Sequence, residues 1–212
     1  MKIEIWSDIA CPFCYIGKRK LEKAIQKLDD SSQVEVEWKS FQLNPDLVSD
    51  PSRSTLDYLS QSKGWSMEQT LQVTSQVVSM AKEEGLNFDF TQTVVANTKN
   101  AHRLLHLAKE SGHQDQLKER LLKAYFSEGK NVDDLATLLQ LAEEVGLGRS
   151  IAEATLRTEM YTDALEKDAY ESRLIGVQGV PFFVFDRKFG ISGAQPDEVF
   201  DRTLKQALDE VK

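Results

Sequence analysis

The sequence predicts an α/β fold in which both ends of the chain build one sheet and a helical block is inserted between them. Three observations carry this prediction: a β-α-β pattern in the first 41 residues, a long central region of helical periodicity, and a β-β-α pattern at the carboxyl end. Neither end can bury a sheet by itself, so a single shared sheet is the economical arrangement.

The amino-terminal pattern begins with an alternating segment. Residues 2–7 place Ile3 and Ile5 between charged neighbours, which is typical of a strand. A turn follows, and Pro12 fits the first turn of a helix that starts at about Cys11. The apolar positions of this helix recur at i, i+3, i+4 and i+7: Leu21, Ala24, Ile25 and Leu28.

The second strand and the helical block come next. Val34, Val36 and Trp38 alternate with charged residues, which predicts a half-buried strand. From residue 53 to 176 the periodicity is helical and no convincing strand is found. Four apolar stripes end near glycines, as helices commonly do: Gly85, Gly112, Gly129 and Gly146. Two further helices are expected over residues 150–157 and 160–175.

The carboxyl end returns to strand character. Residues 182–185 are a continuous apolar run, which suits a strand buried on both faces. A hairpin turn leads to a strand over residues 189–192, and a final helix opens with Pro196 in its first turn. Val211 belongs to the apolar face of that helix. We therefore expect a discontinuous sheet domain of residues 1–45 and 177–212 and a helical insertion of residues 46–176.

The composition is that of an ordinary globular protein with an acidic surface. The chain has 212 residues, of which 41% are hydrophobic and 28% charged, and its net charge is −8. Such a charge disfavours binding to nucleic acid or to an anionic membrane. The first eight residues carry acids where an export signal would be apolar, so a cytoplasmic location is expected.

Cys11 and Cys14 are the most informative residues, because the chain has only two cysteines and they form a Cys-x-x-Cys motif. After a strand and at a helix start, this motif predicts a redox pair. The helix amino terminus is expected to lower the pKa of the Cys11 thiol from its free value of about 8.5. Cys11 would then attack a substrate disulfide, and Cys14, one turn deeper, would release the product.

Neighbouring residues modify this expectation. Phe13 supplies no positive charge to hold a thiolate, and Asp8 would oppose the thiolate if its side chain pointed inward. We interpret Asp8 as a turn or cap residue. The competing interpretation of the cysteines is a zinc site completed by His102 and His106, which are spaced i, i+4. The redox interpretation is favoured because the cysteine pair opens a helix after a strand, and no metal is expected.

Several motifs along the chain resemble the DsbA family of thioredoxin-fold proteins, in particular its FrnE-type branch, which is related to 2-hydroxychromene-2-carboxylate isomerases and kappa-class glutathione transferases. The matching stretches are Trp6-Ser7-Asp8, Cys11-Pro12-Phe13-Cys14-Tyr15-Ile16-Gly17-Lys18, Asn97-Thr98, Ala101-His102-Arg103-Leu104, Ala124-Tyr125-Phe126, Glu128-Gly129-Lys130, Gly176-Val177, Gly179-Val180-Pro181-Phe182-Phe183-Val184-Phe185 and Ser192-Gly193-Ala194-Gln195-Pro196. The resemblance implies a thioredoxin-like fold with a mixed four-stranded sheet and a large helical insertion.

The resemblance also implies roles for residues outside the cysteine pair. The Val180–Pro181 bond is expected to be cis and to face the cysteines, and the Val180 backbone would pair with an extended substrate. Pro12 and Phe13 would help to bind that substrate. DsbA proper carries His between its cysteines where this chain has Phe13, so a strongly oxidising pair is not implied.

A polar set in the helical block has two interpretations. By resemblance, these residues are candidate contacts for glutathione or another substrate: Asn97, Thr98, His102 and Arg103. The alternative is that Asn97 or Thr98 caps a helix and that Arg103 is solvated.

The function expected from these observations is thiol–disulfide oxidoreduction on protein or small-molecule substrates. The alternatives are a glutathione-dependent isomerase or transferase and a redox-sensing or zinc-binding adaptor. No cofactor is expected beyond the redox pair, with glutathione as a candidate co-substrate. The sequence leaves the redox direction and the oligomeric state open.

Overall fold

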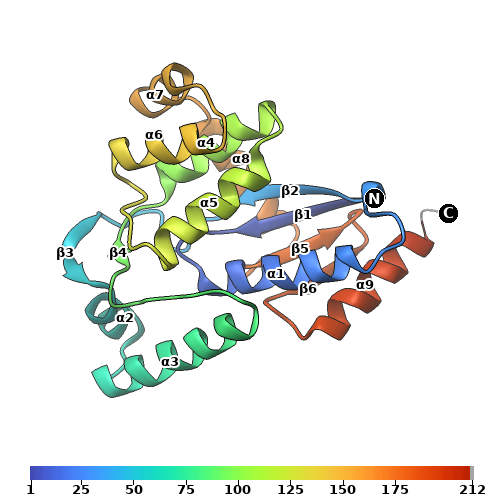
Figure 1. Ribbon diagram of the computed structural model, residues 1–212, viewed down its shortest axis with the longest axis horizontal. Helices are drawn as coiled ribbons and strands as arrows, with labels where there is room; N and C mark the ends of the chain where they lie inside the picture. The colour runs from blue at the N-terminus through green and yellow to red at the C-terminus, as the bar shows by residue number, and fades with distance from the viewer. Residues whose placement is uncertain (211–212) are drawn as a thin grey trace. The chain divides into compact units, whose positions relative to one another are not determined.

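The computed structural model describes residues 1–210, which divide into two compact units. The first unit combines residues 1–43 with the chain from residue 163 onward, and the second is residues 44–162. In Figure 1 the first unit is coloured blue and orange to red, and the second cyan to yellow. Val211, expected on the apolar face of the last helix, lies outside the described residues.

The first unit contains a four-stranded sheet in the order β2-β1-β5-β6. The strands are β1 (Lys2–Ser7), β2 (Glu35–Ser40), β5 (Phe182–Phe185) and β6 (Phe189–Ser192). β1 runs parallel to β2 and antiparallel to β5, and β5 runs antiparallel to β6. Figure 1 shows the blue strands beside the orange ones. The predicted mixed sheet built from both ends of the chain is confirmed.

One face of this sheet forms the apolar core of the first unit. Alternation along β1 sends Ile3 and Ile5 to this face, where they meet Phe183 and Phe185 of β5. Helices α1 (Pro12–Gln26) and α9 (Asp197–Asp209) cover it. They contribute Leu21, Ala24, Phe200, Leu204 and Ala207. Pro196 is the N-cap of α9 and not part of its first turn, so the helix begins one residue later than the sequence predicts.

The opposite face carries charged residues that are nevertheless buried. Glu4, Glu37 and Lys39 lie there beneath α8 (Thr162–Leu174), and their side chains are at most 10% exposed. The carboxylate of Asp168 on α8 accepts a hydrogen bond of 2.7 Å from the Ser40 amide. These contacts explain why α8 belongs to the first unit, whereas the expected boundary at residue 177 assigns it to the insertion.

The second unit is mainly helical. Its helices are α2 (Thr55–Lys63), α3 (Met67–Glu83), α4 (Lys99–Glu110), α5 (Gln114–Phe126), α6 (Leu135–Glu144) and α7 (Arg149–Arg157). Ser66 and Gln69 form a capping box at the start of α3, and Asp134 caps α6 through the Thr137 amide. The four glycines expected at helix ends all have positive φ angles between 62° and 89°.

The prediction that residues 53–176 contain no strand is wrong. β3 (Asp50–Ser54) pairs antiparallel with β4 (Val94–Val95) in a separate two-stranded sheet. β3 reads Asp-Pro-Ser-Arg-Ser and β4 has only two residues, so neither shows the apolar alternation by which a strand is recognised. A short 3₁₀ turn, Ser31–Gln33, also precedes β2.

No helix within residues 1–210 is both long enough and apolar enough to span a membrane.

Candidate functional site

The cysteine pair lies at the start of α1. Cys11 is the N-cap residue with an extended backbone, and Pro12, which has no amide hydrogen to leave unsatisfied, begins the helix. The Cys11 amide donates to the Asp8 carbonyl at 3.4 Å, and the Cys14 amide donates to the Cys11 carbonyl at 3.1 Å. The strand, turn and helix therefore hold both thiols next to the helix amino terminus, as the sequence predicts.

Exposure differs sharply among the four residues of the motif. Cys11 is 4% exposed and Cys14 is 0% exposed, whereas Phe13 is 37% exposed. Both cysteines are free thiols in this structure. Cys11 is thus slightly less buried than Cys14, and the most exposed of the three is Phe13.

The segment before β5 meets the cysteine pair. The Cys11 thiol donates a hydrogen bond to the Val180 carbonyl across a sulfur–oxygen distance of 3.4 Å. The Val180–Pro181 peptide bond is cis. A Cβ atom on Gly17 would lie 3.2 Å from Pro181 Cγ and 2.9 Å from Phe183 Cζ, so only glycine lets α1 approach this closely. The structure thus brings Cys11, Val180 and Pro181 together.

The pKa of the Cys11 thiol is raised well above its ordinary value of 9.0. The largest cause is its hydrogen bond with the Cys14 side chain, followed by burial and by the negative charge that a Cys14 thiolate would carry. The Cys14 amide opposes these effects. The expectation that the helix start lowers this pKa is therefore wrong, because the hydrogen bond with the Cys14 side chain and burial raise it.

Asp8 contributes to the same shift. Its side chain is buried at 2% exposure, and its charge adds to the raised pKa of Cys11. Its Oδ2 atom accepts a 2.8 Å hydrogen bond from the Leu43 amide, so it does act as a turn residue, but one that faces inward. Leu43 itself is 53% exposed. No sequence signal connects it with the cysteines, because the contact depends on the path of the chain after β2.

The polar set of α4 belongs to the second unit, where its members serve mainly as internal contacts. Asn97 accepts from the Lys99 amide at 2.8 Å and donates to the carbonyls of Pro45 and Leu47 at 3.1 and 2.7 Å. The Asn97 side chain therefore binds the first amide of α4, that of Lys99. Thr98 occupies the N-cap position but makes no side-chain cap bond. Thr98, His102 and Arg103 are at most 4% exposed.

Arg103 is buried and not solvated, contrary to one of the two interpretations. Its guanidinium donates to the carbonyls of Thr155, Thr158 and Met160, which close the carboxyl end of α7. It also donates to Asn100 Oδ1 at 3.0 Å. These partners occupy the guanidinium in holding α4 to α7.

The histidines of α4 are not arranged as metal ligands with other groups. Within residues 1–210, no group of three or more His, Cys, Asp or Glu side chains could hold a metal ion. The His106 ring stacks on Tyr161 at a centroid distance of 6.4 Å.

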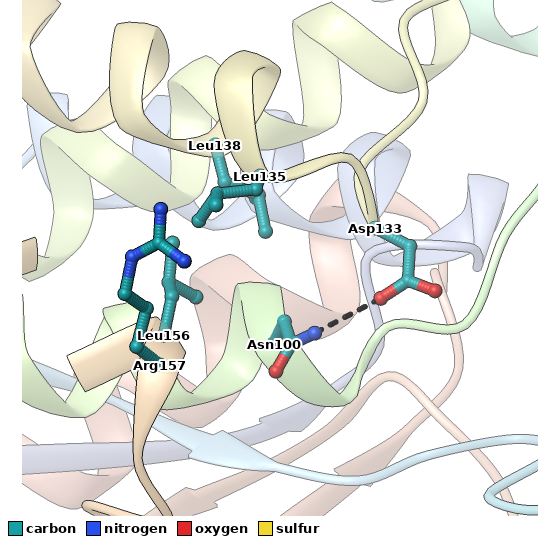
Figure 2. A pocket seen from close by; sticks show the side chains of 6 residues that line it. All are labelled: Asn100, Asp133, Leu135, Leu138, Leu156 and Arg157. Carbon is teal, nitrogen blue, oxygen red and sulfur yellow. Dashed lines mark hydrogen bonds between the residues drawn. The ribbon is translucent and has the colours of Figure 1, made fainter. Parts of the chain in front are cut away.

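A pocket opens in the second unit between α4, α6 and α7. It is lined by Asn100, Asp133, Leu135, Leu138, Leu156 and Arg157. Figure 2 shows Asn100 directed at Asp133, to which it donates a 3.1 Å hydrogen bond. Asp133 also accepts from the Ser49 hydroxyl at 2.5 Å. The Asn100 amide and the Asp133 carboxylate thus bind each other, and Asp133 also binds Ser49, which directly precedes β3.

Comparisons with known proteins agree with this architecture. The family model described as "DSBA-like thioredoxin domain" matches residues 2–205. The crystal structure of a protein described as the probable DsbA oxidoreductase SCO1869 from Streptomyces coelicolor is 39% identical in sequence, with a TM-score of 0.93. The match covers 99% of this chain and 91% of that protein. The thioredoxin-like fold expected from the sequence is confirmed.

Two more distant structures share the fold. One is 2-hydroxychromene-2-carboxylate isomerase, with 16% identity, a TM-score of 0.66, and coverage of 100% of this chain and 96% of that one. The other is the cytosolic disulfide reductase DsbM from Pseudomonas aeruginosa, with 18% identity, a TM-score of 0.66 and coverage of 99% of both chains. The expected relation to both oxidoreductases and isomerases is thus found at the level of the fold.

Proposed function

The chain belongs to the family of DSBA-like thioredoxin domains, and from this premise we propose that it is a thiol–disulfide oxidoreductase that reacts through Cys11 and Cys14. The observation that carries the proposal is the placement of the pair: Cys11 is the N-cap of α1, and Cys14 lies one turn deeper. Two thiols at this spacing can carry both electrons of a disulfide exchange, so no bound cofactor is required.

The reaction follows the chemistry of thiolates. The Cys11 thiolate attacks one sulfur of a substrate disulfide, forms a mixed disulfide and expels the other sulfur as a thiolate. Cys14 then loses its proton and attacks Cys11, which releases the second substrate thiol and leaves a Cys11–Cys14 disulfide. The substrate gains two electrons and two protons, and the pair loses them. A dithiol protein or two molecules of glutathione return the pair to its reduced form.

The raised pKa of Cys11 supports the reducing direction. A pair becomes a strong oxidant when its reduced form is stabilised as a thiolate. In this protein the Cys14 side chain, burial and Asp8 all hold Cys11 as a neutral thiol. Reduction of substrate disulfides also suits a reducing compartment, and we propose the cytoplasm as the location.

The residues around Cys11 suit an extended substrate. Phe13 is exposed at the start of α1, and Val180 presents its carbonyl to the Cys11 sulfur. A substrate strand that pairs with the Val180 backbone would place its own sulfur beside Cys11, flanked by Phe13, Pro12 and Pro181. Disulfide-bonded peptides and small-molecule disulfides are therefore the proposed substrates.

The test is a trapping experiment. The reduced Cys14→Ser protein is mixed anaerobically with a disulfide-bonded peptide, and we expect a mixed disulfide on Cys11 that mass spectrometry identifies. Cys11→Ser should form no adduct and show no turnover. If Cys11→Ser reduces the peptide as fast as wild type, the proposal is wrong.

A further inference from the structure

Trp6 supports the segment that faces Cys11. Its side chain is completely buried on the sheet face opposite α1 and forms a cluster with Val177 and Val184. Val180 packs against this cluster, together with Ile175 and Phe182. The indole is therefore part of the apolar cluster against which Val180 packs.

The indole is held in place by polar contacts at its edge and face. Trp6 Nε1 donates a 3.0 Å hydrogen bond to the Asp168 carbonyl. Two cations lie over the ring, with Lys39 Nζ at 6.0 Å and Arg187 Cζ at 5.7 Å from the ring centroid. A phenylalanine at position 6 would keep the apolar packing of the six-membered ring but lose the N–H donor.

Asp168 connects the indole to the sheet. Its carbonyl accepts from Trp6, its Oδ2 atom accepts from the Ser40 amide at 2.7 Å, and its Oδ1 atom lies 3.2 Å from Lys39 Nζ. The residue is 2% exposed. One residue of α8 thus binds both β1 and β2. The helix ends at Leu174, and the chain then continues to Val180.

We propose that Trp6 and Asp168 are positioning residues for the disulfide chemistry: together they set the place of the Val180 carbonyl at the Cys11 sulfur. This inference rests on the proposed function. α8 ends at Leu174, and the Val177 amide turns back to the Ser172 carbonyl at 2.9 Å. Val177 belongs to the apolar cluster that contains the indole, and Val180 packs against this cluster. A shift of the indole or of α8 reaches the Val180 carbonyl through these contacts and removes an acceptor from the reduced Cys11 thiol.

The variants Trp6→Phe and Asp168→Asn test this inference through a property that structural damage alone would leave unchanged. The readout is the equilibrium constant of the Cys11–Cys14 couple against glutathione. Trp6→Phe removes the hydrogen bond to the Asp168 carbonyl, and loss of one hydrogen bond that is coupled to the thiol should change that constant by about three- to tenfold. Asp168→Asn keeps that carbonyl and an acceptor for the Ser40 amide but loses the ion pair with Lys39, so it tests whether the position of α8 affects the same constant.

The control is Glu128→Gln, which breaks an ion pair with Arg120 in the second unit, where Arg120 Nη2 and Glu128 Oε2 are 2.9 Å apart. We expect lower stability in this variant and an unchanged redox equilibrium. If both Trp6→Phe and Asp168→Asn match wild type within about twofold, the hydrogen-bond effect is absent and the positioning role is wrong.

A measurement on the unaltered protein covers the case in which the variants fail to fold. Indole ¹⁵N–H signals are recorded by NMR for the reduced and the oxidised protein. Trp6 should shift on oxidation, while Trp65 in the second unit should not. An unshifted Trp6 signal would overturn the inference. The trapping experiment keeps the two proposals distinguishable, because a Cys11 adduct in Cys14→Ser upholds the oxidoreductase function whatever Trp6 does.

Discussion

The Cys11 sulfur lies 3.4 Å from the Val180 carbonyl oxygen, although 169 residues separate the two in the sequence. Cys11 comes from the turn after β1, and Val180 comes from the loop before β5. The antiparallel pairing of Trp6 with Phe182 places these two segments at the same end of the neighbouring strands β1 and β5. The environment of the thiol is thus a property of the sheet rather than of the Cys-x-x-Cys motif alone.

The causes of the raised Cys11 pKa predict an order of effects among variants. Cys14→Ala should lower this pKa most, because the Cys14 side chain is the largest cause, and Asp8→Asn should lower it less. Both variants should therefore be alkylated faster than wild type at pH 8, with the larger increase in Cys14→Ala. Iodoacetamide alkylation between pH 6 and 10 measures this pKa. Asp29→Asn, an exposed change beyond the end of α1, is the control.

The same pKa predicts how the stability of the reduced protein depends on pH. The folded pKa of Cys11 lies above the unfolded value, so folding favours the neutral thiol. This contribution is fully present below pH 9.0, the ordinary pKa, and is lost as the pH rises toward the folded pKa. Urea unfolding of the reduced protein at pH 8 and pH 10 should show a steeper loss than the same experiment on Cys11→Ala. Equal losses would contradict the assignment.

Gly17→Ala should destabilise the protein and disturb Pro181. The new methyl group would lie 2.9 Å from Phe183 Cζ and 3.2 Å from Pro181 Cγ, so α1 must move. Overpacking of this kind costs about 1–3 kcal/mol, which chemical denaturation measures. Gly179→Ala is the matched control, because its Cβ would meet nothing within 4 Å. A neutral Gly17→Ala would show that α1 does not pack on Pro181 as described.

Lys39→Met should be strongly destabilising at neutral pH. Lys39 Nζ lies 3.2 Å from carboxylate oxygens of Glu37, Asp168 and Glu171. Burial acts to lower its pKa, but the charges of Asp168 and Glu37 outweigh burial and raise it. Removing the cation takes one ion-pair partner from the buried carboxylates of Asp168 and Glu37. Glu37 keeps Lys2 and Asp168 keeps the Ser40 amide, so the cost should be about 3 kcal/mol, the lower end for a broken buried pair. Urea unfolding at pH 7 and pH 5 should show a smaller loss at pH 5, where carboxylates accept protons more readily. A loss that does not depend on pH would argue for packing alone.

Arg103→Lys should lower stability without affecting the cysteines. A lysine cannot reproduce the donors that bind the carbonyls of Thr155, Thr158 and Met160 at the end of α7. We expect a loss of about 1.5–3 kcal/mol in thermal or urea unfolding. Arg157→Lys, whose side chain is 62% exposed, should stay within about 0.5 kcal/mol of wild type. If Arg103→Lys instead keeps its stability and loses affinity for glutathione, Arg103 is a ligand contact.

The elements of the first unit were predictable because their signals are local. The alternation of Ile3 and Ile5, the apolar run from Phe182 to Phe185 and the 3.6-residue period of α1 each report one element. The prediction that strands from both ends of the chain form one sheet follows because neither end has enough strands and helices to bury a sheet by itself. β3 and β4 carry no such period, so only their pairing reveals them.

The buried charges could not be predicted from the same patterns. Alternation in β2 correctly indicates two faces, but it assigns Glu37 and Lys39 to solvent, and both are buried beneath α8. Each charge is acceptable in the interior only because opposite charges from other elements meet it, and that complementarity is a tertiary property. The raised pKa of Cys11 has this origin only in part: its largest cause, Cys14, and the charge of Asp8 are close to it in sequence, whereas its burial depends on tertiary packing.

The strand order β2-β1-β5-β6 has a consequence for biosynthesis. When the ribosome has made β1, α1 and β2, the second edge of β1 is still open, and it closes only after β5 emerges. Until then the nascent chain presents a bare strand edge beside two unshielded sulfurs. Truncated or stalled products should therefore form intermolecular cross-links and aggregates until β5 pairs with β1.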